Sequence, residues 1–386
     1  MKYETYSEYD PRHTALAESA FLTLWSTLGS WHADLVLVGG LVPKYLCGDL
    51  TQHRSLPRPA TLDVDLGIAL GSDSGQYGSL LWELNGQGFK RSEKHPARLE
   101  KTIGDFPIYV DFLVEHPPRT GGSAQVEDIT ASITPGVDRA LATARTIEVS
   151  GVDLHGANQK LTARVCEVGP FLALKLRAFC DRQQPKDAFD ILYTLRHYDG
   201  GSAAAFAAFA GEVRIGNPAC TDALRTLQEH FQTESLPGPV KASHFVLGQA
   251  QSGESEDTRF LRTTLRQDMV DAAAQLLKAA KERPPHSHYR PTSSPTPLGP
   301  RFRPSTARAG NVCALGTWWR TELRPAIRRR RGWSGLWRWS ISSRGRCMCG
   351  ADGMWRMGLR SRGGAARPWI GYRWLPYARS TAWASG

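Results

Sequence analysis

The chain has few cysteines for its length, and their spacing excludes the common zinc-binding patterns. Among 386 residues there are seven cysteines, and none of them forms a Cys-x-x-Cys pair. The closest pair, Cys347 and Cys349, is too tightly spaced and too isolated for a structural zinc site. Cys47, Cys166 and the other cysteines of the first 290 residues lie in or near apolar runs, which favours buried thiols in a reducing compartment.

Long apolar runs are also absent. No stretch approaches the roughly 18 apolar residues expected of a membrane-spanning helix. The first five residues, Met1-Lys2-Tyr3-Glu4-Thr5, lack the basic and apolar regions of a signal peptide. We therefore expect a soluble, cytoplasmic protein without a membrane partner.

Lysine is absent from Arg290 onward, and acids are scarce there. This segment holds 19 arginines, two acids and nine of the twelve tryptophans, so its net charge is +17, whereas the preceding residues carry a net charge of −6. The mildly acidic body is not typical of a tight, nonspecific nucleic-acid binder. For the last hundred residues three interpretations stay open: a disordered tail, an RNA-binding segment that uses arginine and tryptophan, and GC-rich DNA translated out of frame. We favour the third and expect no fold there.

Two aspartates, Asp63 and Asp65, lie in the stretch Thr61-Leu62-Asp63-Val64-Asp65-Leu66. A strand repeats every second residue, so both carboxylates point to the same side, with Cα atoms roughly 6.6 Å apart. Like charges at this spacing repel each other unless a cation lies between them. The spacing suits two Mg²⁺ ions about 3.5–4 Å apart, the arrangement that serves in-line displacement at a phosphate. An edge strand with a polar face is the plainer alternative.

A glycine pair precedes these aspartates. The apolar run at 35–38 ends in Gly39-Gly40 and continues into Leu41-Val42-Pro43, which predicts a buried strand, a tight turn and the first turn of a helix. Glycine lets the backbone approach a ligand closely, and amides at a helix N-terminus favour phosphate. By itself the pair is weak evidence for a phosphate site, since most such turns are only turns, and its value lies in preceding the Asp-x-Asp strand.

A third aspartate, Asp111, interrupts an otherwise apolar strand candidate at 108–114. An isolated carboxylate in an apolar strand is costly unless it is paired or binds metal. Asp111 is therefore a candidate for a third metal ligand and for the group that accepts the proton of an attacking hydroxyl. The alternative is a frayed strand end in solvent. Residues 98–115 predict an antiparallel pair of strands, and 144–150 and 162–168 are further strand candidates.

Farther along, the chain becomes helical. Residues 171–180 predict a mostly buried helix that contains Lys175, and Pro185 opens a second helix with Asp187 and Asp190 on one face. A buried ammonium needs a partner such as a triphosphate. The alternative is that Lys175 reaches water along its aliphatic stem, and that Asp187 only favours the helix dipole. We predict helices at 170–183, 186–198, 202–213, 218–232 and 256–282.

In combination, these features resemble the AbiEii-type nucleotidyltransferases. They are the Gly-Gly turn, the Asp-Val-Asp strand, Asp111 on a later strand, the buried Lys175 and the helix Lys186-Asp187-x-x-Asp190. The members of this family are the toxin components of bacterial type IV toxin–antitoxin and abortive-infection systems, within the DNA polymerase β-like superfamily. The likeness covers residues 15–280. The spacing from the glycines to the Asp-x-Asp strand is longer than in compact members, and we expect the insert at 49–55 to form a loop.

The resemblance implies a role for each motif. It implies that three acids bind the Mg²⁺ ions and take part in catalysis, namely Asp63, Asp65 and Asp111. It implies that the nucleotide is held by Gly39, Gly40 and Lys175. Asp187 would support the catalytic site from the helical half. The resemblance further implies a nucleoside triphosphate as substrate, RNA and tRNA in particular as acceptor, and a cognate antitoxin as partner.

The expected fold class is α/β (α+β), with three segments. A polymerase β-like nucleotidyltransferase core spans 1–168, a helical C-terminal domain spans 169–284, and a disordered Arg/Trp/Gly-rich tail spans 285–386. A cleft between the first two would hold the ligand, with the acids on one wall and Lys175 with Asp187 on the other. The expected function is Mg²⁺-dependent transfer of a nucleoside monophosphate from the triphosphate to an acceptor hydroxyl.

Two other functions stay open. One is a housekeeping nucleotidyltransferase that acts on tRNA 3′ ends or on small molecules. Enzymes that extend tRNA 3′ ends usually show Val-Arg-Asp straight after the glycines, where this chain has Leu41-Val42-Pro43-Lys44. The other is a non-catalytic nucleotide- or RNA-binding protein, which the presence of all three acids argues against.

Overall fold

The computed structural model describes residues 3–48, 56–69, 79–282, 337–341 and 347–351. The chain divides into two compact units, Met1–Ser293 and Ser294–Gly386. The candidate site lies in the first unit. The predicted insert at 49–55 and most of the predicted tail lie outside the described residues.

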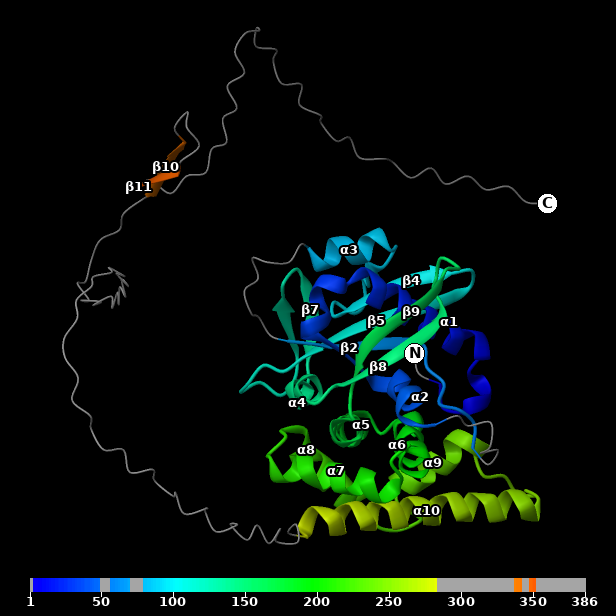
Figure 1. Cartoon of the computed structure of the whole chain (residues 1–386). Coiled ribbons are helices and arrows are strands. Elements are labelled where there is room, and N and C mark those ends of the chain that lie inside the picture. The colour runs from blue at the N-terminus through cyan, green and yellow to red at the C-terminus, as the bar shows by residue number, and fades with distance from the viewer. Residues whose placement is uncertain (1–2, 49–55, 70–78, 283–336, 342–346, 352–386) are drawn as a thin grey trace, which may run out of the picture. The chain divides into compact units, whose positions relative to one another are not determined.

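A mixed sheet forms one part of the first unit (Figure 1). Its strand order is β3-β4-β5-β2-β1-β9-β8, with β7 also paired to β5 and β6 paired to β7. The mixture of parallel and antiparallel pairs with many helices confirms the predicted α/β class. The nine strands among the described residues of this unit are β1 Leu35–Val38, β2 Asp63–Ile68, β3 Lys90–Arg91, β4 Arg98–Ile103, β5 Phe106–Val114, β6 Ser123–Val126, β7 Ile129–Ile133, β8 Arg145–Val152 and β9 Asn158–Val165.

The register of the central strands brings the polar residues of the sheet together. Strand β2 runs parallel to β5, with Asp65 opposite Asp111 and Asp63 opposite Tyr109. On its other side β2 runs antiparallel to β1, with Asp65 opposite Val38 at the end of that strand. The predicted antiparallel pair over 98–115 is confirmed as β4 and β5. Both later strand candidates also belong to this sheet, because β9 pairs with β1 and β8 pairs with β9.

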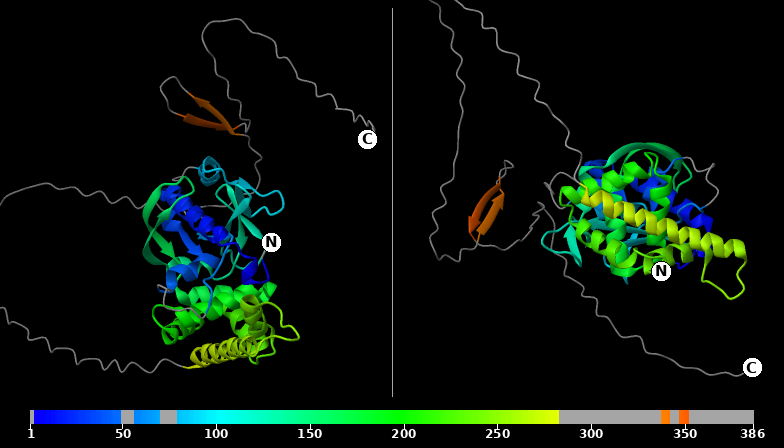
Figure 2. Two further views of the ribbon diagram at one scale, coloured as in Figure 1. Left: turned by 90° about the vertical axis from the view of Figure 1, so that its right-hand side faces the viewer. Right: turned by 90° about the horizontal axis from the view of Figure 1, so that it is seen from below.

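Helices surround the sheet and form a layer at one end of it. Helix α10 packs against α7 and α9 and crosses the other helices of this layer (Figure 2). The longer predicted helices are confirmed, with ends shifted by a few residues. The helices are α1 Pro11–Thr27, α2 Val42–Leu46, α3 Leu80–Gly86, α4 Val137–Ala142, α5 Val168–Arg182, α6 Pro185–His197, α7 Ser202–Arg214, α8 Ala219–His230, α9 Pro237–Leu247 and α10 Glu256–Lys281.

Among the helices after residue 168, α9 has no counterpart among the predicted helices. It begins at Pro237, and Gly238 and Pro239 follow directly. Proline and glycine are typical of a break in a helix. Proline is nevertheless tolerated in the first helical turn, because a backbone N–H at that position would have no intrahelical partner. The remaining residues of α9 are held by packing, since Ala242 and Phe245 are fully buried.

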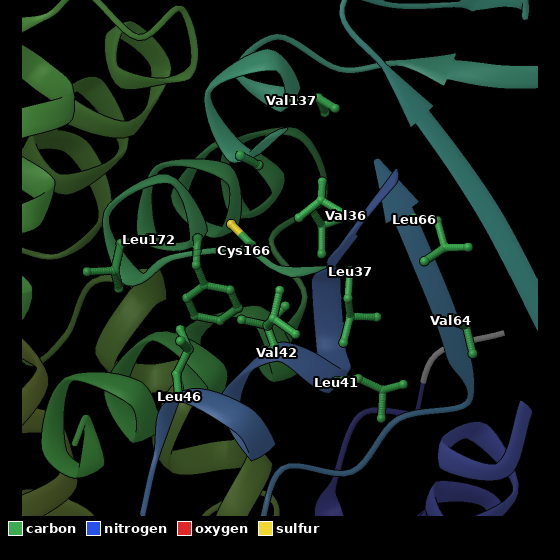
Figure 3. Close-up of a cluster of buried hydrophobic side chains, with 14 of the residues drawn as sticks. Val36, Leu37, Leu41, Val42, Leu46, Val64, Leu66, Val137, Cys166 and Leu172 are labelled. Carbon is green, nitrogen blue, oxygen red and sulfur yellow. The ribbon is translucent and has the colours of Figure 1, made fainter. Parts of the chain in front are cut away.

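A continuous hydrophobic core joins the sheet to the helical layer. Figure 3 shows Val36 and Leu37 of β1, Val42 of α2 and Leu172 of α5 in one cluster. The same cluster extends to Met269 of α10. Helix α5 is therefore fixed against the end of β1. It begins shortly after the chain leaves the sheet at the end of β9, the strand that pairs with β1. The predicted boundary at residue 168 falls where α5 begins, inside one compact unit.

The second unit contains two described strands, β10 Trp337–Ile341 and β11 Cys347–Ala351, which pair antiparallel. The sequence predicts no fold in this segment, and these ten residues differ from that prediction. In β10 the residues Trp337, Trp339 and Ile341 alternate with polar ones, and aromatic and β-branched residues favour strands.

Among the helices of the described residues, none is long and apolar enough to cross a membrane.

Candidate functional site

The Gly-Gly turn lies where β1 enters α2, and it permits a close approach between the backbone and two charged side chains. Gly39 adopts φ +74°, and a Cβ at this position would collide with the carboxylate of Asp65. A Cβ at Gly40 would lie 2.7 Å from Thr61 Oγ1 and 3.0 Å from Lys186 Nζ. The Gly40 N–H donates to Asp65 Oδ2 at 3.4 Å. Larger residues would therefore push Asp65 and Lys186 away from the turn.

The three predicted acids come together beside this turn. Asp63, Asp65 and Asp111 each offer one carboxylate oxygen, and these oxygens all lie within 4.8 Å of one another. Asp63 is buried, whereas Asp65 and Asp111 are half-buried. Hard divalent cations bind carboxylate oxygens at about 2.0–2.6 Å, so oxygens on opposite sides of one ion lie about 4–5 Å apart. The group is compact enough to hold a metal ion.

Arg98 is a member of this site that the sequence did not predict. It starts β4 and lies opposite Asp111 in the β4–β5 pair. Its Nε donates to Asp111 Oδ1 at 2.8 Å and its Nη2 donates to Asp111 Oδ2 at 2.5 Å, while Nη2 is 3.9 Å from Asp63 Oδ2. The guanidinium also stacks on Tyr109, with Cζ 4.6 Å from the ring centroid. The hydrogen bonds from Arg98 to Asp111 outweigh its burial and raise the pKa of Arg98.

Lys175 lies on α5 and is buried, as predicted, but it does not reach water. Its Nζ is 3.1 Å from Asp187 Oδ1 and 2.6 Å from Asp190 Oδ2, both on α6. Burial alone would lower the pKa of Lys175, but attraction to Asp190 and Asp187 raises it above the usual value. The alternative in which Lys175 reaches solvent along its stem is therefore wrong, because its charge is balanced inside the protein by two carboxylates. Its predicted contact with a nucleotide stays a prediction.

Two further cations complete this buried cluster. Lys186 Nζ lies 2.6 Å from Asp190 Oδ2, and Arg182 binds Asp187 through Nε at 2.6 Å and Nη2 at 2.8 Å. Asp187 and Asp190 are almost wholly buried, so they do not line the cavity described below. Asp187 instead holds Lys175 and Arg182 in place. The cluster carries three positive and two negative charges.

A cavity of about 780 Å³ lies between the sheet and α5. One wall carries Asp65, Asp111 and Arg98, and the opposite wall is a stripe along α5 with a helical spacing of three and four residues. Arg182 lies at the C-terminal end of this stripe and is 39% exposed in its side chain. The residues of α5 that line the cavity are Phe171, Leu174, Lys175, Arg177, Ala178, Asp181 and Arg182.

The far part of the cavity is lined by residues that carry hydroxyl groups or apolar side chains. Leu113 continues the face of β5 that carries Asp111, and Ser132 lies opposite it on β7. Thr120 and Thr134 complete this part. Arg177 borders it as well, but its guanidinium is bound to Asp222 and to the Thr120 carbonyl. The cavity therefore offers one charged end and one mixed polar and apolar end.

The arrangement combines oxygen ligands suited to a cation with cationic side chains suited to phosphate, across one cavity. Gly39 lines this cavity, whereas Gly40 lines a small adjoining pocket together with Asp63 and Lys186. The structure brings the three acids together and places Lys175 in the lining of the cavity that Asp65 and Asp111 also line, whereas the site residues predicted from the sequence did not include Arg98, Arg182 or Lys186. No family model matches the chain, and a search of curated proteins finds no match.

Proposed function

We propose that the protein is a Mg²⁺-dependent nucleotidyltransferase that transfers a nucleoside monophosphate from a nucleoside triphosphate to an acceptor hydroxyl. One observation carries this proposal: three carboxylates from two adjacent strands converge within 4.8 Å, and two of them, Asp65 and Asp111, line a cavity whose opposite wall carries Lys175 and Arg182. A triphosphate bound to divalent metal needs both features, because the metal bridges protein carboxylates and phosphate oxygens.

The residues fit a metal-bound triphosphate by charge and by ligand type. Asp63, Asp65 and Asp111 supply hard oxygen ligands of the kind that Mg²⁺ prefers. Arg182 supplies a partly exposed guanidinium, and its pKa is raised: burial lowers it, and attraction to Asp187 and, to a smaller extent, Asp65 and Asp63 outweighs that effect. Mg²⁺, when bound, would stabilise negative charge that develops on the phosphates.

The side chains would divide the work of the transfer between the two walls. The acceptor oxygen forms a bond to the α-phosphorus while the bond from that phosphorus to the bridging oxygen breaks, and pyrophosphate leaves with the electron pair. Asp111 would accept the proton of the acceptor hydroxyl or orient that hydroxyl. Arg182 would pair with the phosphates, and Lys175 and Asp187 would hold Arg182 and helix α5 in position. The backbone at Gly39 would lie against the β- and γ-phosphates.

The motif resemblance makes RNA, and tRNA in particular, the acceptor that we propose. On the same resemblance we propose that the protein is a growth-arresting toxin with a cognate antitoxin. A housekeeping nucleotidyltransferase would share the site but not the toxicity. Induced expression separates these two functions, because we expect growth arrest from the natural sequence and normal growth from Asp63→Asn. Normal growth with both sequences would contradict the toxin assignment.

Label transfer tests the activity directly. Purified protein is incubated with each α-labelled nucleoside triphosphate, Mg²⁺ and total RNA, and labelled RNA is separated by size. We expect transfer from at least one triphosphate, loss of transfer in Asp63→Asn, and normal transfer in Asp105→Asn, which removes the same charge from an exposed turn. Absence of transfer, or equal transfer in Asp63→Asn, would contradict the proposal.

A further inference from the structure

Arg98 occupies a position between the acids that a divalent cation would need. Its Nη2 lies 2.5 Å from Asp111 Oδ2 and 3.9 Å from Asp63 Oδ2. An ion shared by these carboxylates would lie about 2.1 Å from an oxygen of each. Such an ion would therefore be brought close to the guanidinium nitrogen, and two like charges at that distance repel strongly in a site that is mostly shielded from water.

The geometry of the Arg98–Asp111 pair explains why it forms when no metal is bound. The two hydrogen bonds are parallel and bidentate, the strongest form of an arginine–carboxylate pair. Tyr109 supports the guanidinium from one side, so the pair is held in one orientation. Only 18% of the Arg98 side chain and 19% of the Asp111 side chain is exposed. Three carboxylates in this space would repel one another without a cation, and Arg98 supplies one.

We propose that Arg98 is a built-in counter-ion of the acidic site, which competes with divalent metal for Asp111 and moves to the phosphates when metal and nucleotide bind. This inference rests on the proposed function for the identity of the second partner. Arg98 lines the same cavity as Arg182, so a triphosphate in the cavity lies within its reach. A guanidinium recognises a phosphate with the same bidentate geometry that it uses for a carboxylate. Arg98 is thus a positioning residue that couples metal binding to nucleotide binding.

The chain offers a matched control for this pair. Arg145 forms a similar fork with Glu167, with Nε 2.8 Å from Oε1 and Nη2 3.3 Å from Oε2, and its Cζ lies 5.9 Å from the Tyr198 ring. Arg145 lines neither of the two pockets described above. Substitution of Arg145 removes an arginine–carboxylate pair supported by a tyrosine, without changing the charge of the acidic site.

The experiment measures binding of Mn²⁺ alone, by electron paramagnetic resonance, to the full chain and to Arg98→Gln, Arg98→Ala and Arg145→Ala. We expect Mn²⁺ to bind about tenfold tighter or more in both Arg98 variants, because a neighbouring positive charge is removed. Arg145→Ala should bind Mn²⁺ like the unchanged protein. Arg98→Gln keeps a polar side chain of similar shape and serves if Arg98→Ala does not fold. Unchanged or weaker Mn²⁺ binding in folded Arg98→Gln would overturn the inference.

Kinetics supply a second readout. In Arg98→Gln the Mg²⁺ concentration for half-maximal label transfer should fall, while the KM for the nucleoside triphosphate should rise by about tenfold. A rise in both quantities would overturn the counter-ion role, since it would show that Arg98 supports metal binding. The two proposals fail separately. Tighter Mn²⁺ binding without label transfer in the unchanged protein would contradict only the nucleotidyltransferase, and transfer without tighter Mn²⁺ binding would contradict only the counter-ion.

Discussion

The acidic group on the sheet and the ion cluster on α5 and α6 both combine carboxylates with cationic side chains, but acids outnumber cations in the first and cations outnumber acids in the second. The sheet group has three carboxylates and one guanidinium, and part of it faces a cavity. The helical cluster has two carboxylates and three cations, and its carboxylates are closed off from solvent. In the first group Arg98 contacts Asp111 beside the cavity, and in the second group both carboxylates are bound to cations inside the protein.

This difference in burial should separate the effects that mutations in the two groups have on stability and on activity. Burying a charge costs several kcal/mol unless a partner compensates for it. Asp187 and Asp190 can therefore remain charged in the interior only because cations contact them. Asp65 and Asp111 line a cavity, where a cation from solution can reach them. We therefore expect changes in the helical cluster to affect mainly stability, and changes in the sheet group to affect mainly activity.

The largest expected effect comes from Asp190→Ala. Asp190 is fully buried and contacts both Lys175 and Lys186, so its removal leaves two ammonium groups without this carboxylate in the interior. We expect the free energy of unfolding to fall by about 3–5 kcal/mol, as measured by urea denaturation. The exposed pair of Lys160 and Glu148 provides the control, and Glu148→Ala should change the free energy of unfolding by about 1 kcal/mol or less. Similar values for Asp190→Ala and Glu148→Ala would remove the distinction between the two groups.

The second largest effect is expected on activity instead of stability, and Asp65→Asn tests it. Loss of one ligand carboxylate should lower kcat/KM for label transfer by about 10²–10³-fold, the scale found when one electrostatic group of an active site is removed. The free energy of unfolding should change by about 1 kcal/mol or less, because relief of repulsion among the three acids offsets lost contacts. If Asp65→Asn destabilised the protein as much as Asp190→Ala does, the expected difference between the two groups would be contradicted.

Gly39→Ala tests the contact between the turn and the acidic group. Gly39 adopts φ +74° and has Asp65 in the position that a Cβ would take. We expect a loss of about 1–3 kcal/mol in the free energy of unfolding from backbone strain, together with reduced label transfer, because Asp65 must move. Gly29→Ala is the matched control, since a Cβ at Gly29 meets no atom within 4 Å. Equal stability and activity in the two variants would show that the turn does not position Asp65.

The smallest expected effect is the stabilisation by Mg²⁺. A ligand that binds only the folded state at ten times its Kd raises the free energy of unfolding by about 1.4 kcal/mol. We expect this increase in the unchanged protein, its reversal by a chelator, and its absence in Asp63→Asn. Asp190→Ala, if folded, should still respond to Mg²⁺, because its change lies in the other group. A response to Mg²⁺ that survives Asp63→Asn would place the ion elsewhere.

Much of the acidic group could be predicted from local patterns. The alternation around Asp63 and Asp65 sets both carboxylates on one face, whatever the strand pairs with. Asp111 lies in a nearly apolar strand, and the parallel pairing of β2 with β5 then aligns it with Asp65. The helix with Lys175 is also evident in the sequence, because buried helices carry such continuous apolar runs.

Arg98 was missed although the sequence contains a signal for it. A tight connection at Gly104-Asp105 joins β4 to β5, with Ile103 opposite Phe106. Counting outward from this hairpin places residue 98 opposite residue 111, since the register of a hairpin follows from its turn. The partner of Asp111 was therefore within reach of sequence analysis once the hairpin was recognised.

The partners of Lys175 could not be predicted from the sequence in this way. Asp187 and Asp190 have the right spacing to share a helix face, but that spacing does not say which face turns toward α5. The crossing of α5 and α6 decides it, and this crossing depends on packing within the whole core. A buried lysine beside an acid-bearing helix is equally consistent with a ligand and with an internal ion pair until the helices are placed.

The sequence alone determined which side chains lie on one face of a strand or helix, because backbone periodicity is a local property of the chain. It also determined the excess of acid on β2. Only the tertiary structure decided which opposite charges on different helices meet, because Coulomb and hydrogen-bond energies depend on separation in space and not along the chain. The contact of Lys175 with Asp190 therefore emerged only when α5 and α6 were packed together, whereas the contact of Arg98 with Asp111 follows from the register of one hairpin.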